Sequence, residues 1–306
     1  MDNFLSIDEL SIYQFHEVLD LAGQVKSHPD RFKEKLKDKV LAMIFEKPSL
    51  RTRMTFQVGM LQLGGHAVYL GPSDIQLGRR ESTHDVGKNL ERWVDMIMIR
   101  TFDHQIAEDL ATYTRTPVIN ALTDALHPCQ GMADFLTIKE RHHDLTNLTL
   151  AYIGDGNNVC HSLLLAAAKA GSQMKVATPP GYEPDPIYVK KAEEAGMETG
   201  FRLEVSFDPA EAAKEAHAVY TDTWTSMGQE AEKKERTHIF SRYQVNSDLM
   251  AKAHPQAIFM HCLPAHRGEE VTDEVMDSAQ SVVFEQAENR LHLQKAIMLL
   301  LMGIKK

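Results

Sequence analysis

The feature of this 306-residue sequence that most constrains its fold is an alternation of short apolar runs with helix-like segments along the whole chain. The apolar runs are four to six residues long, which is typical of parallel strands that helices cover on both faces. In the first half of the chain, the expected strands are residues 40–45, 67–70, 96–100 and 118–122. The expected helices of this half are residues 7–25 (beginning after Ser6), 50–63, 85–94, 104–113 and 129–141.

The pattern starts again in the second half. The expected strands there are residues 148–153, 175–177, 203–207, 218–221, 258–261 and 282–284, and the expected helices are 159–170, 186–195, 210–216 and 288–302. Two such arrays predict an α/β protein of two doubly wound parallel-sheet domains with an active-site cleft between them. We expect residues 1–130, joined by the C-terminal helix at about 287–306, to form one domain and residues 145–286 the other.

Charge and hydropathy exclude several classes of protein. The formal net charge of −10 and the pI of about 5.8 argue against general nucleic-acid binding, which needs a basic face. The N-terminal segment has no apolar stretch typical of a secretory signal. The apolar run at residues 297–302 is far shorter than the roughly 20 residues that span a bilayer. We therefore expect no membrane partner.

The cysteines and histidines predict no metal site. Cys129, Cys160 and Cys262 are far apart and form no CxxC pair, which fits a reduced cytoplasmic protein without a disulfide framework. The 15 histidines form no HExxH motif. We expect His142 and His143 to lie at an exposed helix end.

The residues that follow each expected strand are the candidate site residues, because ligands in doubly wound sheets bind beyond the carboxyl ends of the strands. The first strand runs into FEKPSLRTR, where Ser49 is a good N-cap for the next helix. A helix N-terminus carrying Arg51, Thr52 and Arg53 suits a phosphate, although the segment is not a P-loop. The alternative is a capped helix with a solvated arginine face.

Two more clusters follow strands of the first half. Arg100 ends one strand, and TDALHPCQ brings His127 and Gln130 after the next. Each alone has an ordinary explanation, since a strand-end arginine is usually a surface residue and His127 suits a loop histidine with its hydrogen bonds satisfied. Together they are candidates to polarise a carbonyl group.

The second half contributes three further segments. IGDGNN resembles a dinucleotide loop, but Val159 stands where GxGxxG needs its third glycine, so Asn157 and Asn158 fit a helix cap instead. The other two segments are DTWTSMG, with Asp222 and Ser226, and MHCLPAHR, with His261 and Cys262. A buried cysteine is usually inert, so Cys262 alone indicates little.

Taken together, FEKPSLRTR, HPCQ, GDGNN, DTWTSMG and HCLP strongly resemble the ornithine carbamoyltransferase family, in the family's order and over essentially the whole chain. The resemblance implies transfer of a carbamoyl group from carbamoyl phosphate to the δ-amine of L-ornithine, in arginine biosynthesis. It implies no metal or organic cofactor. It also implies a cytoplasmic homotrimer with sites shared between subunits.

The resemblance assigns roles residue by residue. The catalytic residues are Cys262, as proton acceptor, with Arg100, His127 and Thr52 around the carbonyl oxygen. The residues matching the carbamoyl phosphate site are Ser49, Leu50 (through its backbone), Arg51, Thr52, Gln76, Arg100, His127, Gln130, Cys262, Leu263 and Arg290. Those matching the ornithine site are Asn158, Asp222, Ser226 and Met227.

Two positions depart from the commonest family pattern. Leu50 stands where most members have threonine, so one hydroxyl is absent from the phosphate motif, and Arg80 stands where some have lysine. Gln76, in SDIQLGRRES, matches a residue that reaches the neighbouring subunit's site; from sequence alone this segment would be a solvated loop.

Two alternative functions remain open at this stage. One is a carbamoyltransferase for another amine, such as putrescine, acetylornithine or aspartate. An aspartate site needs cations for a second carboxylate, whereas DTWTSMG offers an anion. The other is a catalytically silent binding protein on the same fold, which the full set of candidate residues disfavours.

Overall fold

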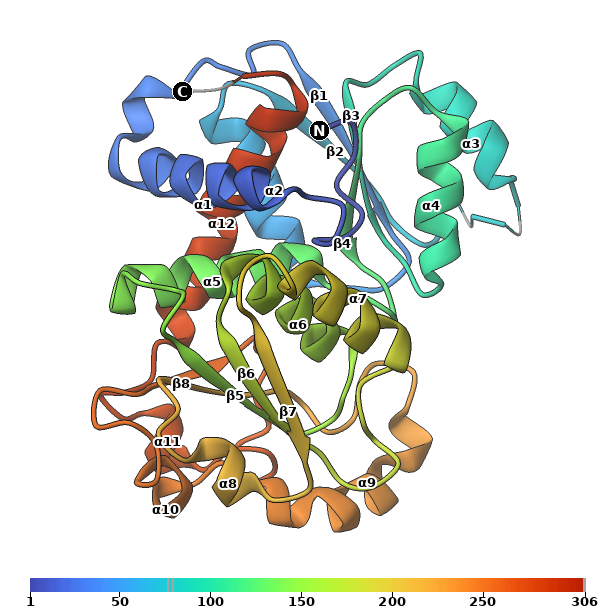
Figure 1. Cartoon of the computed structure of the whole chain (residues 1–306). Helices are drawn as coiled ribbons and strands as arrows, with labels where there is room; N and C mark the ends of the chain where they lie inside the picture. The colour runs from blue at the N-terminus through green and yellow to red at the C-terminus, as the bar shows by residue number, and fades with distance from the viewer. Residues whose placement is uncertain (76, 79, 305–306) are drawn as a thin grey trace. The chain divides into compact units, whose positions relative to one another are not determined.

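A computed structural model describes residues 1–75, 77–78 and 80–304 of the chain, with Glu230 described through its backbone only. The chain divides into two compact units, Met1–Leu136 with Glu288–Lys306, and Thr137–Ala287, called unit 1 and unit 2 below. Each unit contains one parallel sheet flanked by helices (Figure 1), which confirms the predicted fold class. The chain passes from one unit to the other within α5 (Pro128–His142) and returns within α12 (Val283–Leu301).

Unit 1 is built on a four-stranded parallel sheet in the order β2-β1-β3-β4. The strands are β1 (Val40–Phe45), β2 (His66–Leu70), β3 (Met96–Arg100) and β4 (Val118–Leu122). The helices of this unit, besides parts of α5 and α12, are α1 (Ile12–Ser27), α2 (Leu50–Gln62), α3 (Thr83–Leu90) and α4 (His104–Tyr113), with the short 3-10 helix η1 (Pro29–Arg31).

Helices cover both faces of this sheet. Figure 1 shows α3 and α4 on one side and α1, α2 and α12 on the other. On the first side, Ile44, Ile97 and Ile99 pack with Val86 and Leu110 in one apolar cluster. Strands β1, β3 and β4 are almost fully buried, whereas β2 at the edge is partly exposed. This burial explains why the inner strands have continuous apolar sequences.

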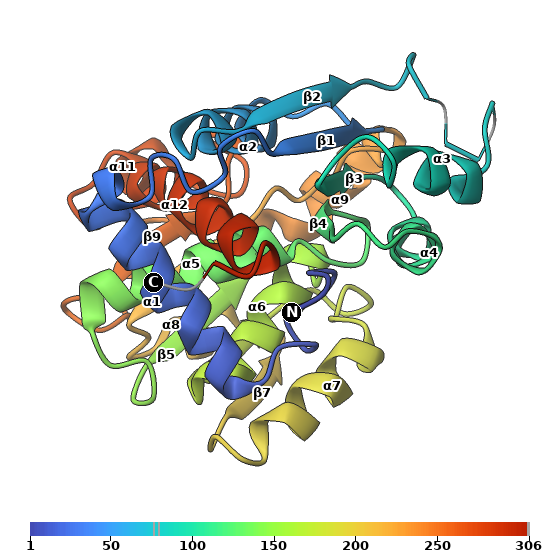
Figure 2. The same cartoon turned by 90° about the horizontal axis from the view of Figure 1, so that it is seen from above.

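Unit 2 has a five-stranded parallel sheet in the order β7-β6-β5-β8-β9. Its strands are β5 (Thr149–Ile153), β6 (Gln173–Ala177), β7 (Arg202–Ser206), β8 (Ala218–Thr221) and β9 (Ile258–His261). Its helices are α6 (Asn158–Ala170), α7 (Pro186–Gly196), α8 (Pro209–Ala213), α9 (Lys233–Phe240), α10 (Ser247–Met250) and α11 (Asp273–Met276), with the 3-10 helices η2 (Glu230–Glu232) and η3 (Ser241–Tyr243). Figure 2 shows α6 and α7 together on one side of this unit.

The start of the first helix differs from the prediction. The helix begins at Ile12 rather than residue 7, because Ser11 and Gln14 form a complete capping box. Ser6 instead lies just before a turn, and its hydroxyl bonds the carboxylate of Asp8. Both Ser6 and Ser11 are followed three residues later by Glu or Gln, so the motif alone could not choose between them.

The expected strand at residues 282–284 is also wrong. The segment instead opens α12 at Val283, five residues before the predicted helix start, and only an isolated bridge joins Ser281 to Phe259. Short apolar runs cannot distinguish a strand from a buried helix turn by periodicity. Helices α9, α10 and α11 were not predicted, because they are short and lack a long apolar period. Among the described residues, no helix has the length and apolar character needed to cross a membrane.

The prediction that His142 lies at an exposed helix end is wrong as well. His142 is half-buried and meets the ring of His217 edge-on, with 5.8 Å between ring centroids. His217 in turn stacks on His254 at 4.8 Å. His217 Nδ1 accepts a hydrogen bond from Thr149 N at 3.2 Å, so this imidazole must be neutral at that nitrogen. His143, by contrast, is exposed as expected.

This histidine cluster predicts a loss of stability in weak acid. Burial, followed by the neighbouring His217, lowers the pKa of His142, and burial followed by His254 lowers the pKa of His217. A depressed histidine pKa stabilises the fold above the ordinary value of about 6.5, and this stabilisation is lost as the pH falls below it. We expect the urea concentration at the midpoint of unfolding to decrease when the pH is lowered from 7.5 to 5.5.

Substitution separates this cluster from other titrating groups. In His217→Asn the side chain cannot take up a proton and can still accept from Thr149 N, so the midpoint should depend less on pH than in the wild type. His143→Asn, at the exposed neighbouring position, is the matched control and should keep the wild-type dependence. An unchanged pH dependence in His217→Asn would rule out the cluster as the cause.

Candidate active site

In both units, several candidate residues follow the strands on either side of the point where the order of strands reverses. In unit 1 this switch point lies between β1 and β3, and in unit 2 between β5 and β8. Loops at the carboxyl ends of strands form the ligand crevice at such points. The segments after β1, β3 and β4 therefore form one half-site in unit 1, and those after β5, β8 and β9 form another in unit 2.

The phosphate-type half-site of unit 1 begins at the N-terminus of α2. Ser49 caps this helix, and its Oγ accepts a hydrogen bond from Thr52 N at 3.2 Å. Thr52 is buried, whereas the Leu50 side chain is 74% exposed and offers the site only its backbone. The amides and the positive dipole end of α2 thus favour an anion here.

Arg290 connects three segments of unit 1. It lies on α12 and is buried. Its Nη1 donates to Gln130 Oε1 at 2.6 Å, and its Nη2 donates to Thr52 Oγ1 at 3.1 Å. Gln130 Nε2 donates in turn to Asp134 Oδ1 at 2.7 Å. Asp134 was not predicted from the sequence, although it stands one helical turn after Gln130 on α5.

His127 lies among positive charges and is neutral. Burial lowers the pKa of His127 well below its ordinary value, and the charges of Arg290, Arg100 and Arg51 lower it further. These three guanidiniums come from α12, the end of β3 and the start of α2. Three predicted arginines thus act electrostatically on one predicted histidine, which makes this part of unit 1 electropositive.

Arg53 is positioned differently from Arg51. Arg53 is exposed, and its guanidinium lies over the ring of Tyr69 on β2, 3.9 Å from the centroid. Thus the sequence motif places two arginines near the helix start, but they have different surroundings. Gln76 lies outside the described residues, and Arg80 is exposed.

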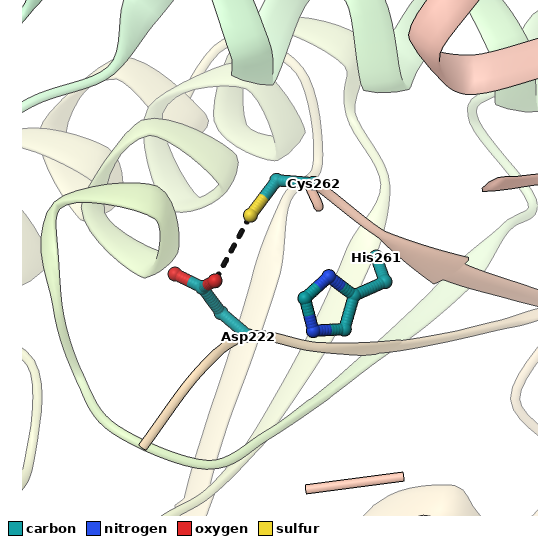
Figure 3. Close-up of side chains that lie close together, drawn as sticks. All are labelled: Asp222, His261 and Cys262. Atoms are coloured by element: carbon teal, nitrogen blue, oxygen red, sulfur yellow. Dashed lines mark hydrogen bonds between the residues drawn. The ribbon is translucent and has the colours of Figure 1, made fainter. Parts of the chain in front are cut away.

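The half-site of unit 2 centres on the carboxylate of Asp222, directly after β8. Cys262 Sγ donates to Asp222 Oδ1 at 2.9 Å (Figure 3). Asn157 Nδ2 donates to Asp222 Oδ2 at 2.8 Å. Asn157, rather than Asn158, is the N-cap of α6, and its Oδ1 accepts from Val159 N and Cys160 N. Asn158 is the first residue of the helix.

His261 lies beside this pair in Figure 3, but both nitrogens of its ring face other partners. Its Nδ1 accepts from Leu263 N at 2.8 Å, and its Nε2 lies 3.2 Å from Glu270 Oε1. Leu263 has a left-handed backbone with φ of 58°, which a non-glycine residue adopts only when its surroundings stabilise it. His261 thus holds the turn that presents Cys262 and the Leu263 carbonyl. The sequence did not predict this role.

Ser226 and Met227 lie on the loop after β8. Ser226 N donates to Gln229 Oε1 at 3.1 Å, and Met227 is exposed. Arg236 on α9 anchors this loop, because its Nε donates to Trp224 O and its Nη2 pairs with the carboxylate of Asp155. Arg236 was not predicted, because nothing in its local sequence indicates a buried partner.

Asp155 adds a second acidic group to this half-site. Burial raises the pKa of Asp155 to about 6, against the opposing effect of Arg236, and the charge of Asp222 raises it further. The pairing with Arg236 offsets one of the two carboxylates. Asp222 is then the carboxylate that the half-site can present to a cationic group.

Family comparisons agree with this chemistry. The carbamoyl-P binding domain of aspartate/ornithine carbamoyltransferase matches residues 2–140, and the Asp/Orn binding domain matches residues 146–301. This chain belongs to the aspartate/ornithine carbamoyltransferase family. The two matched domains each contain one of the half-sites described above.

The relatives of this carbamoyltransferase span nearly its whole length. The ornithine carbamoyltransferase of Thermococcus kodakarensis is 56% identical to it over 88% of this chain and 85% of that protein. The ornithine carbamoyltransferase of Carboxydothermus hydrogenoformans is 53% identical to it over 98% of this chain and 97% of that protein. The solved structure of ornithine carbamoyltransferase from Pyrococcus furiosus matches with a TM-score of 0.96 and 50% identity, covering 98% and 97% of the two chains.

The three cysteines of this carbamoyltransferase should differ sharply in reactivity. Cys129 and Cys160 are buried, and burial raises the pKa of Cys129 to about 12 and that of Cys160 well above its usual range. Cys262 is only partly buried. Because the thiolate is the reactive form, a chromogenic disulfide reagent at pH 8 should modify Cys262 alone in the native protein.

Unfolding in denaturant provides the reference for this titration, since all three thiols should then react. The Cys262→Ala variant is the control, and its native form should show no fast reaction. Modification of a second thiol in the native protein would contradict the assignment of Cys129 and Cys160 as inert.

Proposed function

We propose that this chain is an ornithine carbamoyltransferase, which transfers the carbamoyl group of carbamoyl phosphate to the δ-amine of L-ornithine and releases L-citrulline and phosphate. The observation that carries the proposal is the pairing of chemistries on one chain. Unit 1 offers a site of three guanidiniums around a neutral imidazole. Unit 2 offers a carboxylate beside a thiol. An anionic acyl donor and a cationic amine are the substrates that suit these two sites.

The residues of unit 1 would bind and activate the acyl donor. Ser49, the Leu50 amide, Arg51 and Thr52 would hold the phosphate, with the N-terminus of α2 contributing its amide donors. A Gln76 contact would come from a neighbouring subunit. Arg290 already donates to Thr52 and Gln130, so its charge lies next to both groups.

Negative charge develops on the carbonyl oxygen when the amine attacks. Arg100, His127 and Thr52 would stabilise this charge, and each preorganised donor of this kind contributes about 3–4 kcal/mol to transition states in other enzymes. The depressed pKa of His127 means that it would act as a neutral hydrogen-bond donor over the working pH range. Gln130 and the Leu263 carbonyl would hold the carbamoyl NH2 group.

The residues of unit 2 would orient the amine. The Asp222 carboxylate would bind the α-ammonium, while Asn158 and the Met227 amide would bind the α-carboxylate. Ser226 would complete this site. The neutral δ-nitrogen then forms a bond to the carbamoyl carbon, the carbon–oxygen bond to phosphate breaks, and the nitrogen loses a proton, for which Cys262 in its thiolate form is the proposed acceptor.

The substrate assignment is tested by measuring product formation with ornithine, putrescine, acetylornithine and aspartate in parallel. Ornithine should be the preferred amine. In Asp222→Asn, the loss of a charged hydrogen bond of about 1.5–3 kcal/mol should weaken ornithine binding about 10- to 150-fold. The KM for carbamoyl phosphate should change less, because most residues of its proposed site belong to unit 1.

Asp248→Asn is the matched control for this experiment, since Asp248 is an exposed acid of the same unit. This variant should keep wild-type kinetics. Near-wild-type ornithine kinetics in Asp222→Asn would reject the assignment of the α-ammonium site. Faster turnover of another amine would instead favour a sister carbamoyltransferase.

The assembly that best fits this chain is a cytoplasmic homotrimer. An exposed apolar surface on unit 1 supports self-association: Met54 and Leu61 on α2 are 50% and 72% exposed, and Val68 on β2 is 48% exposed. Met54 and Leu61 are seven residues apart and therefore lie on the same face of α2, and an exposed apolar face of this kind suits an interaction surface. A role in arginine biosynthesis is supported by a Pyrococcus furiosus relative described as anabolic, which is 55% identical over 88% of this chain and 85% of that protein.

Shared sites predict complementation between inactive variants. A site built from Arg51 of one subunit and Gln76 of the next is damaged by Arg51→Ala or Gln76→Ala. In a cyclic trimer refolded from equal amounts of both variants, about a quarter of the sites should have both residues intact. Activity should therefore recover toward about that fraction of the wild type.

Differently tagged chains would establish that mixed trimers have formed. Each parent refolded alone is the control and should remain severely impaired. Confirmed mixed trimers that are as inactive as their parents would exclude a shared site involving Gln76.

A further inference from the structure

A group of metal-ligand side chains lies apart from the catalytic pair, in the loop between β9 and α11 of unit 2. His266 Nδ1 and one carboxylate oxygen from each of Glu269 and Glu270 all lie within 4.8 Å of one another. The distance from His266 Nδ1 to Glu270 Oε2 is 3.8 Å. One imidazole and two carboxylates thus converge from a single short loop.

Glu270 is the least usual member of this group because it is fully buried. Its Oε1 accepts from His266 N and faces His261 Nε2. Its Oε2 is buried too, and within residues 1–75, 77–78 and 80–304 it has no hydrogen-bond partner. His266 Nδ1 is too far away for a hydrogen bond. A buried carboxylate oxygen in this state is unfavourable without a cation.

The other two side chains can reach a cation beside that oxygen. The His266 side chain is 43% exposed, so its ring can rotate at little expense of packing. Glu269 Oε1 pairs with Lys233 Nζ at 2.8 Å, and the carboxylate has a second oxygen. Two zinc ligands at tetrahedral angles lie about 3.4 Å apart, so the observed separation of 3.8 Å needs only a small adjustment.

We propose that His266, Glu269 and Glu270 form a binding site for a divalent transition-metal ion, with Zn²⁺ as the ion that the ligand set suits best. Imidazole nitrogen and carboxylate oxygen are both ordinary zinc ligands, and three protein ligands leave a fourth position for water. The site takes no part in carbamoyl transfer. Its connection to the catalytic loop is structural, since Glu270 also faces His261, which holds the turn after β9.

The experiment must separate this site from two others that could hold zinc. The thiol of Cys262 beside Asp222 is one, and the cluster of His142, His217 and His254 is the other. We therefore choose Cys262→Ala as the background and titrate the full-length, chelator-treated protein with Zn²⁺ by calorimetry. His266→Ala and Glu269→Gln are then added singly to this background. His254→Ala is the matched histidine control.

The background protein should bind one Zn²⁺ per chain at this site. His266→Ala and Glu269→Gln should each weaken that binding at least tenfold, whereas His254→Ala should leave it unchanged. Anomalous scattering at the zinc edge, from crystals of the background protein, should show the ion next to Glu270 Oε2. The proposal is overturned if the background protein binds no Zn²⁺, if the affinity is independent of His266 and Glu269, or if the anomalous peak lies at the histidine cluster.

Discussion

The buried guanidinium of Arg290 is the interaction on which unit 1 depends. Its two hydrogen bonds reach Thr52 at the start of α2 and Gln130 on α5, so one side chain of α12 joins three helices. A buried positive charge is unfavourable unless it is matched by hydrogen bonds and by a negative partner. The hydrogen bonds to Thr52 and Gln130 come from the fold, and under the proposed function an anionic substrate would add negative charge nearby. Burial, followed by the charge of Arg290, also lowers the pKa of His127 and so favours its neutral form.

Unit 2 buries negative rather than positive charge, and it also compensates that charge with hydrogen bonds and an ion pair. Its buried carboxylates, Asp155 and Asp222, have different partners. Arg236 pairs with Asp155, whereas Asp222 accepts from the uncharged donors Asn157, Thr223 and Cys262. An uncharged shell leaves Asp222 free to attract a cation. Ion pairing of Asp155 instead anchors the loop that carries Ser226 and Met227. Asp155 therefore has a structural role in its ion pair, whereas Asp222 is suited to bind a cationic group of a substrate.

Local sequence was sufficient for much of the architecture. Strands β1, β3, β4, β8 and β9 and helix α4 have the predicted bounds, because each is a run whose period and flanking residues agree. The N-cap at Ser49 was predicted for the same local reason. Where two local signals were equivalent, as at Ser6 and Ser11, or where a short run suited two structures, as at residues 282–284, packing decided the outcome.

The sequence by itself determined the alternation of strands and helices, the polar residues that follow each strand, and the motifs that resemble one enzyme family. These depend on residues close together in the chain. Only the tertiary structure decided which distant side chains meet: Arg290 with Thr52, Arg236 with Asp155, and His142 with His217. These contacts depend on the order of strands in each sheet and on which side chains are buried. Neither feature is a property of any single segment.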